Sequence, residues 1–277
     1  ILSSAIGGKQ SQKIIDIHDG HYQASASPVM SGNAVSGIAL LIFDVTEREN
    51  SEQMRREFTA NVSHELRTPL HSISGYAELL KNGMVKSGDV KPVATKIYDE
   101  AQRMVRLVED IINLSHLDEG AEDMIKEEVD LYDIVRSTIE SLSPEAEAAG
   151  VTVSFSGQHV AVNGISQLLS GIVYNLCDNA IKYNRQGGSV SVSLSSDEKD
   201  AVLTVSDTGI GIPAEHQQRI FERFYRVDKS HSKEVGGTGL GLSIVKHAAK
   251  IHDAKIKLSS VPDQGTEITV IFPKSLS

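Results

Sequence analysis

Apolar residues recur every three or four positions over a long segment that follows Thr46. The members of this stripe are Met54, Phe58, Val62, Leu66, Pro69, Ile73 and Leu80. At about 100° per residue they fall on one face of a helix, and the phase is kept across Pro69. The pattern therefore predicts one long helix that is capped by Thr46, kinked at Pro69 and ended by Asn82 and Gly83.

A second helix is predicted after a connecting loop over residues 86–92. The positions of its seam follow in steps of four and three, which is the spacing of a coiled coil, and they are Ile97, Ala101, Met104, Val108, Ile111 and Ser115, all apolar except the last. Two antiparallel amphipathic helices bury too little apolar surface alone. Because a second hairpin would cover both seams, the pattern predicts a homodimeric four-helix bundle formed by residues 47–120.

The flanking segments have other periodicities. Residues 1–46 predict three strands without helices, at 13–17, 22–29 and 38–45. Residues 121–277 predict strands at 127–129, 151–155, 159–162, 189–194, 201–207, 255–259 and 266–272, and helices at 131–149, 164–184 and 239–252, the first capped by Asp130. Strands with segregated helices predict an α/β sandwich with one helical layer. The whole chain is thus expected to be α+β, divided at 1–46, 47–120 and 121–277.

Composition narrows the classes of function. The formal net charge of −10 argues against a general nucleic-acid binder, which needs a basic surface. The single cysteine, Cys177, cannot form an internal disulfide and is expected to be buried and inert. The longest apolar run, over residues 35–45, falls well short of the roughly 20 residues that span a bilayer.

His64 lies opposite the apolar stripe and is followed by Glu65. A lone exposed histidine is usually only a solvated side chain. Here, however, Pro69 lacks the N–H that would bond the Glu65 carbonyl, so the distortion of the helix is centred beside His64. A carboxylate that holds Nδ1–H leaves the Nε2 lone pair available, and His64 is therefore a candidate nucleophile.

Three polar side chains share one face of the helix predicted over residues 164–184. Asn175, Asn179 and Lys182 lie at i, i+4 and i+7. Two amide oxygens and an ammonium suit a hydrated Mg²⁺ with a polyphosphate. The alternative is a polar surface stripe, but an apolar face on the same helix already supplies the core, which leaves the polar face for solvent or a site.

Two glycine-rich stretches and a basic segment complete the pattern. Asp207 ends a strand and precedes Gly209 and Gly211, so its carboxylate could accept the exocyclic amine of a purine at close backbone approach. Residues 236–242 open a helix and could bind an anion there. The basic segment between them carries Arg219, Arg223, Arg226, Lys229, His231 and Lys233. Together these features predict an ATP site with a mobile lid.

Five motifs in this order resemble those of bacterial sensor histidine kinases of two-component systems. They are HELRTP (64–69), NLCDNAIKYN (175–184), DTGIGIP (207–213), FERFYR (221–226) and GGTGLGL (236–242). The wording of the last two is most similar to phosphate-responsive and cell-wall-responsive sensor kinases, and residues 1–46 resemble the last strands of a PAS domain. The resemblance implies a dimeric phosphotransfer bundle followed by an ATP-binding domain of the histidine kinase, chaperone and topoisomerase type.

The resemblance also implies roles for individual residues. His64 would be the phosphoacceptor, Glu65 its acid/base partner, and Thr68 would position water for dephosphorylation of a response regulator. Asn179, supported by Asn175, would ligate Mg²⁺, while Lys182 would lie near the phosphates. Asp207 would read adenine, with Gly209 and Gly211 allowing the approach and Tyr183 flanking the base. The phosphates and the lid would be served by Gly237, Thr238, Gly239, Leu240, Gly241 and Arg223.

The expected partners are a second copy of the chain through residues 47–120 and the aspartate of a response regulator, with no nucleic acid. Because the chain begins at Ile1, we expect a cytoplasmic fragment of a protein anchored in the bacterial plasma membrane by upstream segments. Two alternatives are a serine kinase or conformational ATPase of the same superfamily, and a nucleotide-binding scaffold that works mainly as a regulator phosphatase. HELRTP argues against the first alternative, and the intact glycine motifs argue against the second.

Overall fold

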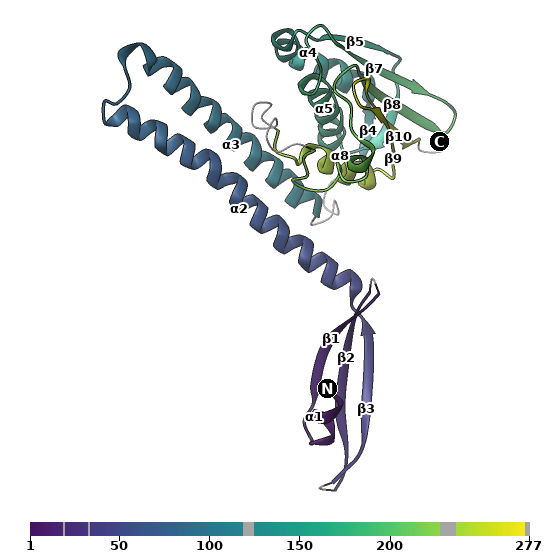
Figure 1. Cartoon of the computed structure of the whole chain (residues 1–277). Helices are drawn as coiled ribbons and strands as arrows, with labels where there is room; N and C mark the ends of the chain where they lie inside the picture. Colours follow the sequence, from purple (N-terminus) through teal and green to yellow (C-terminus); the bar gives the residue numbers. More distant parts are fainter. Residues whose placement is uncertain (19, 33, 119–124, 228–236, 275–277) are drawn as a thin grey trace. The chain divides into compact units, whose positions relative to one another are not determined.

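The computed structural model describes residues 1–18, 20–32, 34–118, 125–227 and 237–274 (Figure 1). The chain divides into two compact units, Ile1–His64 and Glu65–Ser277. The boundary between the units falls inside one long helix. The predicted divisions after residues 46 and 120 therefore remain predictions.

The N-terminal unit begins as an antiparallel meander. A short helix α1 (Leu2–Ile6) precedes β1 (Ser11–Ile17), β2 (Gly20–Ser31) and β3 (Ala34–Asp44), in the order β1-β2-β3. The three predicted strands are confirmed, whereas α1 was not predicted. Four consecutive apolar residues of β3, at positions 40–43, are exposed in this sheet.

Helix α2 (Thr46–Lys81) runs without interruption through Pro69, as the apolar stripe predicted. Phe58, Val62 and Leu66 of the stripe are half-buried, and Pro69 is buried. The predicted cap at Thr46 was wrong, because α2 begins at Thr46 itself and the Thr46 hydroxyl bonds the backbone of His21. Asp44 Oδ1 instead accepts from the N–H of Thr46 at 2.9 Å. Over the part of the chain described, no helix is both long and apolar enough to cross a bilayer.

Helix α3 (Val90–Asp118) follows a short 3₁₀ turn, η1 (Ser87–Asp89). The predicted loop over residues 86–92 was therefore too long, because Pro92 lies in the first turn of α3, where its missing N–H costs no hydrogen bond. The predicted seam is partly uncovered, and Val108 is 41% exposed. A second face, formed by Leu107, Leu114 and Leu117, is buried, and α3 packs against helix α8 (Gly241–Ile251).

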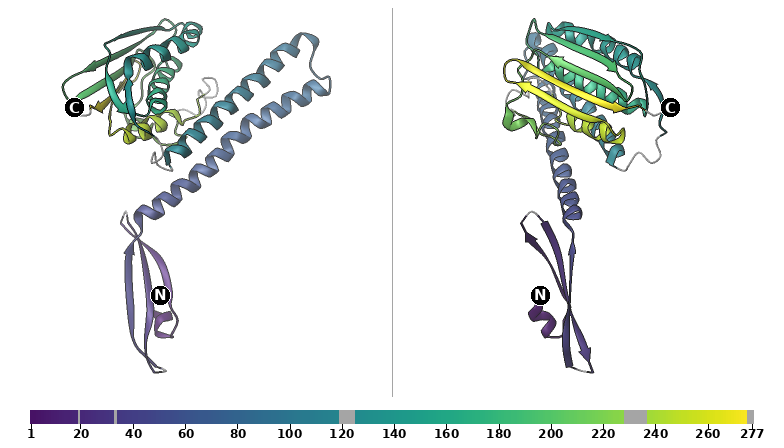
Figure 2. Two further views of the ribbon diagram at one scale, coloured as in Figure 1. Left: turned by 180° about the vertical axis from the view of Figure 1, so that it is seen from behind. Right: turned by 90° about the vertical axis from the view of Figure 1, so that its right-hand side faces the viewer.

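The C-terminal sheet has five strands in the order β5-β7-β8-β10-β9. These are β5 (Thr152–Gly157), β7 (Ser189–Ser196), β8 (Asp200–Asp207), β9 (Lys255–Val261) and β10 (Gly265–Pro273). Helices α4 (Leu131–Ala149), α5 (Ser166–Lys182) and α8 lie on one face of this sheet (Figure 2). Alternate residues of β7, β8 and β10 are buried beneath them. The predicted α/β sandwich with one helical layer is confirmed.

Smaller elements complete this domain. Strand β4 (Glu127–Asp130) pairs with β6 (Ala161–Gly164), and helix α6 (Ala214–Gln217) follows β8. Asp130 caps α4, as predicted, by accepting from Tyr132 N at 2.9 Å.

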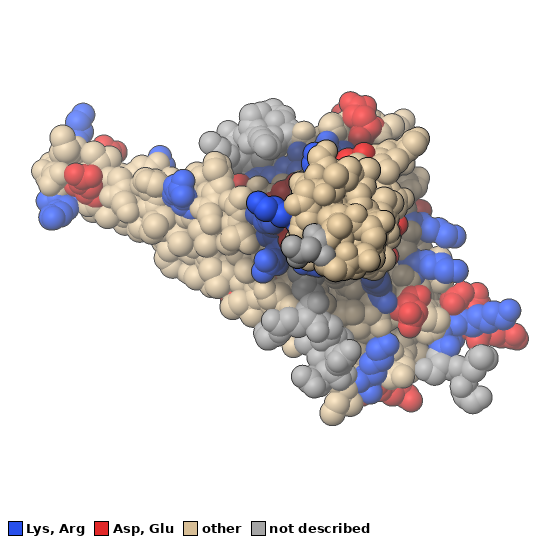
Figure 3. Space-filling view, turned by 90° about the horizontal axis from the view of Figure 1, so that it is seen from below, with Lys and Arg blue, Asp and Glu red and all other residues tan. Residues whose placement is uncertain are grey.

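Cys177 is buried, and burial raises the pKa of its thiol to about 12, so it remains an unreactive thiol at neutral pH. Basic and acidic side chains are interspersed on the face shown in Figure 3.

A buried histidine joins the end of α8 to the start of α5. His252 Nδ1 donates to Ala248 O at 2.7 Å, and Nε2 accepts from Ile165 N at 2.9 Å. Only the neutral imidazole can make both bonds, because an imidazolium has no acceptor nitrogen. Burial is the main cause that lowers the pKa of His252 below its ordinary value. The folded domain therefore favours the neutral side chain.

We expect acid to destabilise the wild-type chain through His252. Since the folded pKa is lower than the unfolded one, the unfolded state binds more protons as the pH falls through about 6.5. The stability contribution is thus complete above pH 6.5 and is lost progressively below it. The free energy of unfolding is measured with urea at pH 7 and at pH 5.5. Between these two pH values it should fall less in His252→Gln than in wild type. His71→Gln, which removes an exposed histidine, should retain the wild-type loss, and an equal loss in all three chains would contradict the assignment.

Candidate functional site

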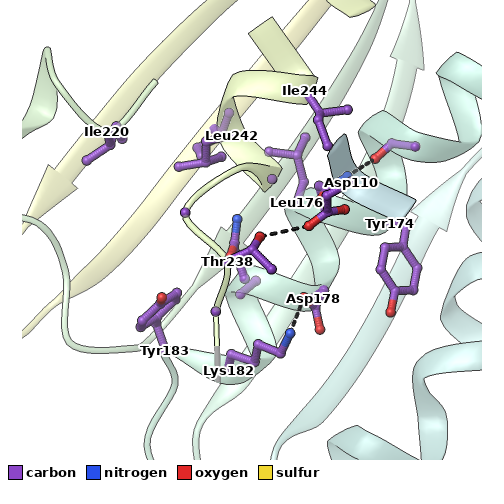
Figure 4. A pocket seen from close by; sticks show the side chains of 18 of the residues that line it. Asp110, Tyr174, Leu176, Asp178, Lys182, Tyr183, Ile220, Thr238, Leu242 and Ile244 are labelled. Carbon is purple, nitrogen blue, oxygen red and sulfur yellow. Dashed lines mark hydrogen bonds and ion pairs between the residues drawn. The ribbon is translucent and has the colours of Figure 1, made fainter. Parts of the chain in front are cut away.

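A cavity of about 650 Å³ opens in the C-terminal unit among α5, the loop after β8, the loop before α8, and α3 (Figure 4). Ten of the predicted nucleotide-site residues line it, namely Asn175, Asn179, Lys182, Tyr183, Asp207, Gly211, Gly237, Thr238, Gly239 and Gly241. Three predicted residues, Gly209, Arg223 and Leu240, are not part of the lining. The volume is within the range of pockets that hold small ligands.

Helix α5 presents its polar face to this cavity. The Nδ2 of Asn175 donates to Gly171 O at 2.8 Å, which fixes the amide and leaves its oxygen for another contact. The ammonium of Lys182 pairs with the Asp178 carboxylate at 2.6 Å, so part of its positive charge is offset by a second residue of the lining. Within the described ranges, the Asn179 side chain has no hydrogen-bond partner. An amide oxygen in that position suits a hard cation such as Mg²⁺.

Asp207 stands at the end of β8, where the strand enters the cavity. Its Oδ1 accepts from Gly209 N at 2.7 Å and from Thr266 N at 3.3 Å. Burial raises the pKa of the Asp207 carboxyl, and these two backbone hydrogen bonds oppose the rise. The bonds orient the carboxylate, which fits a hydrogen-bond acceptor for an exocyclic amine.

Two glycines after Asp207 are required by space. A side chain at Gly209 would collide with the carbonyl oxygen of Tyr183, and one at Gly211 would collide with that of Val261. Gly211 also has a φ of +65°, which other residues adopt only with strain. Gly209 therefore contributes by allowing the close approach of two backbone segments, although it does not line the cavity.

The loop before α8 is joined to the FERFYR segment. Phe224 N donates to Gly239 O at 2.8 Å, and both residues have positive φ, +61° for Phe224 and +74° for Gly239. A Cβ at Gly239 would lie 2.9 Å from Phe224 Cα, so the contact needs glycine. The loop leads into the N-terminus of α8, where backbone N–H groups favour an anion.

The basic segment is less concentrated on the cavity than the sequence predicted. Arg219 pairs with Glu222 at 3.2 Å and lies 4.3 Å over the ring of Tyr225. Arg223 approaches His247 at 3.2 Å and is not among the residues that line the cavity. Among the three arginines of the segment, only Arg226 lines the cavity. Lys229, His231 and Lys233, together with Gly236, lie outside the described residues.

Helix α3 supplies lining residues that the sequence analysis missed. Arg106, Glu109 and Asp110 face the cavity, and Asp110 Oδ2 accepts from Thr238 Oγ1 at 2.7 Å (Figure 4). Burial is the main cause that raises the pKa of Asp110. The spacing of Leu107, Leu114 and Leu117 marks this face of α3, but no pattern in the sequence indicates what it packs against.

The predicted phosphoacceptor residues lie on α2. His64 is exposed, as its position opposite the apolar stripe predicted, while Thr68 is also exposed and Glu65 is half-buried. An exposed imidazole is accessible to a reacting group, whereas a buried one would not be. Their catalytic roles remain predictions.

Two families match the chain. Residues 54–120 match the "His Kinase A (phospho-acceptor) domain", and residues 164–276 match the "Histidine kinase-, DNA gyrase B-, and HSP90-like ATPase". The first match contains the HELRTP box, and the second contains the residues that line most of the cavity.

The chain is also similar to known kinases. It is 35% identical to the sensor histidine kinase WalK of Bacillus subtilis over 243 residues, which is 86% of this chain but only 40% of that protein. The ShkA structure with AMPPNP has a TM-score of 0.58 at 26% identity and covers 80% of this chain and 47% of that one. The structure of the histidine kinase ThkA with the response regulator protein TrrA has a TM-score of 0.64 at 20% identity, covering 99% and 81%. With a phosphoacceptor domain and an ATPase domain in this order, the chain belongs to the sensor histidine kinases of bacterial two-component systems.

Proposed function

We propose that this chain transfers the γ-phosphoryl group of ATP to His64 and then to an aspartate of a response regulator. The observation that carries the proposal is the cavity that gathers ten predicted nucleotide-site residues in a domain of the ATPase family. The chain spans 40% of the length of the WalK relative.

The site residues divide the work of binding. Asp207 accepts the amine of the purine, Tyr183 flanks the base, and Gly209 and Gly211 let the backbone approach it. The loop from Gly237 to Gly241, which includes Thr238 and Leu240, binds the phosphates through its backbone N–H groups. Lys182 of α5 adds a positive charge beside them. Asn179, oriented beside Asn175, holds Mg²⁺, which when bound would offset the charge of the phosphates. Arg223 is a weaker candidate, because it lies outside the lining.

The transfer step needs little covalent chemistry from the protein. Glu65 holds the Nδ1 proton of His64, and the Nε2 lone pair attacks the terminal phosphorus as the bond to the bridging oxygen breaks and ADP leaves. In the second step a regulator aspartate attacks phospho-His64, and the imidazole returns to its neutral form. Because positioning dominates such reactions, transfer requires the terminal phosphorus of ATP to be held in line with His64 Nε2.

The proposed partners follow from the family and from the exposed seam of α3. The phosphoacceptor domain of residues 47–120 forms a homodimer, which covers apolar side chains such as Val108 that one chain leaves exposed. The response regulator is a separate protein, as TrrA is for ThkA. The N-terminal residues 1–46 belong to a PAS-like module and residues 121–277 to the ATP-binding domain. We further propose that the full protein is anchored in the plasma membrane by segments outside this chain.

Labelling tests the proposed function directly. The purified chain is incubated with ATP labelled at the γ-phosphate and Mg²⁺, and the protein is then separated from nucleotide. A phosphohistidine resists base and is hydrolysed in acid, whereas a phosphoserine behaves in the opposite way. Label that is lost in acid and then passes to a purified response regulator supports the proposal. Base-labile, acid-stable label would instead support the serine kinase alternative.

Thr68→Ala should separate the two activities of the phosphoacceptor helix. Thr68 is exposed one turn after His64, where its hydroxyl can orient the water that attacks a phosphorylated regulator. We expect autophosphorylation to change less than twofold and regulator dephosphorylation to fall about tenfold. Both rates are measured with the same labelled regulator. Thr59→Ala, an exposed threonine on α2 whose hydroxyl bonds Arg55 O, is the matched control and should preserve both; loss of both rates in Thr68→Ala would contradict the assignment.

A further inference from the structure

One contact in the cavity joins α3, the second helix of the predicted phosphotransfer bundle, to the loop of residues 237–241, called the glycine loop below. Asp110 of α3 accepts a hydrogen bond of 2.7 Å from the hydroxyl of Thr238, which lies between Gly237 and Gly239 (Figure 4). Thr238 Oγ1 also accepts from Leu240 N at 3.3 Å. The Asp110 carboxylate is thus connected to the N-terminal turn of α8 through a single hydroxyl.

Apolar packing holds α3 in this position. Leu107, Asp110, Leu114 and Leu117 follow in steps of three, four and three, so they share one face of the helix. The three leucines are at most 6% exposed, and α3 packs against α8. This face differs from the partly exposed seam that includes Val108. Asp110 therefore interrupts an otherwise apolar face, and its charge is placed at the glycine loop by the packing around it.

The carboxylate of Asp110 lies near groups that are predicted to serve the phosphates. The positive charge of Lys182 attracts it, and Lys182 and the N-terminus of α8 are both predicted to serve the phosphates. Asp178 and Glu109 repel it, as they would repel any further anion. A nucleotide brings several negative charges to the same donors, and like charges in a partly buried site repel strongly.

We propose that Asp110 is a self-inhibitory latch, whose carboxylate competes with nucleotide phosphates for the glycine loop. This inference rests on the proposed function, since it needs a nucleotide in the cavity. In the latched state α3 covers the phosphate end of the cavity and Thr238 is engaged. Binding of nucleotide requires the carboxylate to leave, which also frees α3 from the ATP-binding domain. The latch thereby couples occupation of the site to release of the phosphotransfer helix.

Asp110→Asn tests the latch with little change of shape. The amide can still accept from Thr238, but it carries no charge. Binding of a fluorescent ATP analogue to the full chain should become about fivefold tighter or more, with or without Mg²⁺. Since the latch has to open before nucleotide enters, stopped-flow mixing should show a faster association rate and a dissociation rate changed by less than twofold. A general loosening of the fold would not raise the association rate while leaving the dissociation rate nearly unchanged.

Asp99→Asn is the matched control. Asp99 is exposed on the same helix and outside the cavity lining, so its substitution makes the same change of net charge without touching the loop. Its nucleotide affinity should equal that of wild type. Asp110→Ala serves as the second variant and should also bind more tightly, because it removes the same charge.

Three outcomes distinguish the ideas. Wild type that binds nucleotide as tightly as Asp110→Asn would overturn the latch and leave the proposed function intact. Weaker binding in Asp110→Asn that appears only with Mg²⁺ would also overturn it, and would make Asp110 a metal ligand instead. A wild-type chain and an Asp110→Asn chain that both fail to bind nucleotide would overturn the proposed function itself.

Discussion

His64→Gln should abolish the transfer of labelled phosphate from ATP to this chain, a loss of at least about 10³-fold. Glutamine is polar and similar in size, but its amide nitrogen has no basic lone pair to attack phosphorus. His64 is exposed on α2, so the substitution removes no buried contact from the core. The measurement is incorporation of label at neutral pH, followed by separation of protein from nucleotide. Nucleotide affinity should be unchanged, because the ATP-binding domain is not altered.

His71→Gln is the control for this loss. His71 is exposed on the same helix two turns further on, and its Nδ1 bonds Arg67 O at 2.8 Å. It should be phosphorylated at the wild-type level because His64 is retained. Label that persists in His64→Gln and disappears in His71→Gln would move the phosphoacceptor to the second histidine. Equal label in His64→Gln and His71→Gln would show that neither histidine is the phosphoacceptor.

Asn179→Ala should reduce autophosphorylation about 100-fold or more while leaving metal-free nucleotide binding nearly unchanged. The proposed role of Asn179 is to hold Mg²⁺, and its side chain has no hydrogen-bond partner among the described residues that it would leave unpaired. The loss should therefore appear only where the metal contributes. Affinity for a fluorescent ATP analogue is measured with Mg²⁺ and with EDTA. Wild type should bind more tightly with Mg²⁺, and the variant should show little difference.

Asn163→Ala controls for loss of an asparagine in the same domain. Asn163 is exposed on β6 and does not line the cavity. Its variant should keep both the Mg²⁺ effect and the wild-type rate. If Asn179→Ala weakens binding equally with Mg²⁺ and with EDTA, the side chain contacts the nucleotide or supports the fold, and the metal role is wrong.

Local pattern was enough for much of this fold. The stripe from Phe58 to Leu80 predicted that α2 continues across Pro69, since a helix that restarted would have lost the phase. The strands predicted at 189–194 and 201–207 are present as β7 and β8, and Asp130 was identified as a cap from its place before a predicted helix. Errors arose at ends, as at Thr46 and Pro92, because a cap or a first turn is decided by one or two hydrogen bonds that no period records.

Candidate site residues divide in the same way. Asn175, Asn179 and Lys182 could be grouped in advance, because helical spacing alone places them on one face. The direction of a flexible side chain was not predictable, and Arg223 is an example, because its guanidinium meets His247 instead of the cavity. Arg226, three residues later in the same basic segment, lines the cavity instead.

By itself, the sequence determined the long helices, most of the strands and the order of five motifs, because each depends on neighbours within a few residues and on residue chemistry. Only the tertiary structure decided that motifs up to 66 positions apart, from Asn175 to Gly241, line one cavity. It alone also showed that Asp110 meets Thr238 there. The physical reason is that long-range contacts depend on how whole apolar faces pack. The leucine face of α3 can be recognised from its spacing, but its partner α8 lies more than a hundred residues away and leaves no trace in the local pattern.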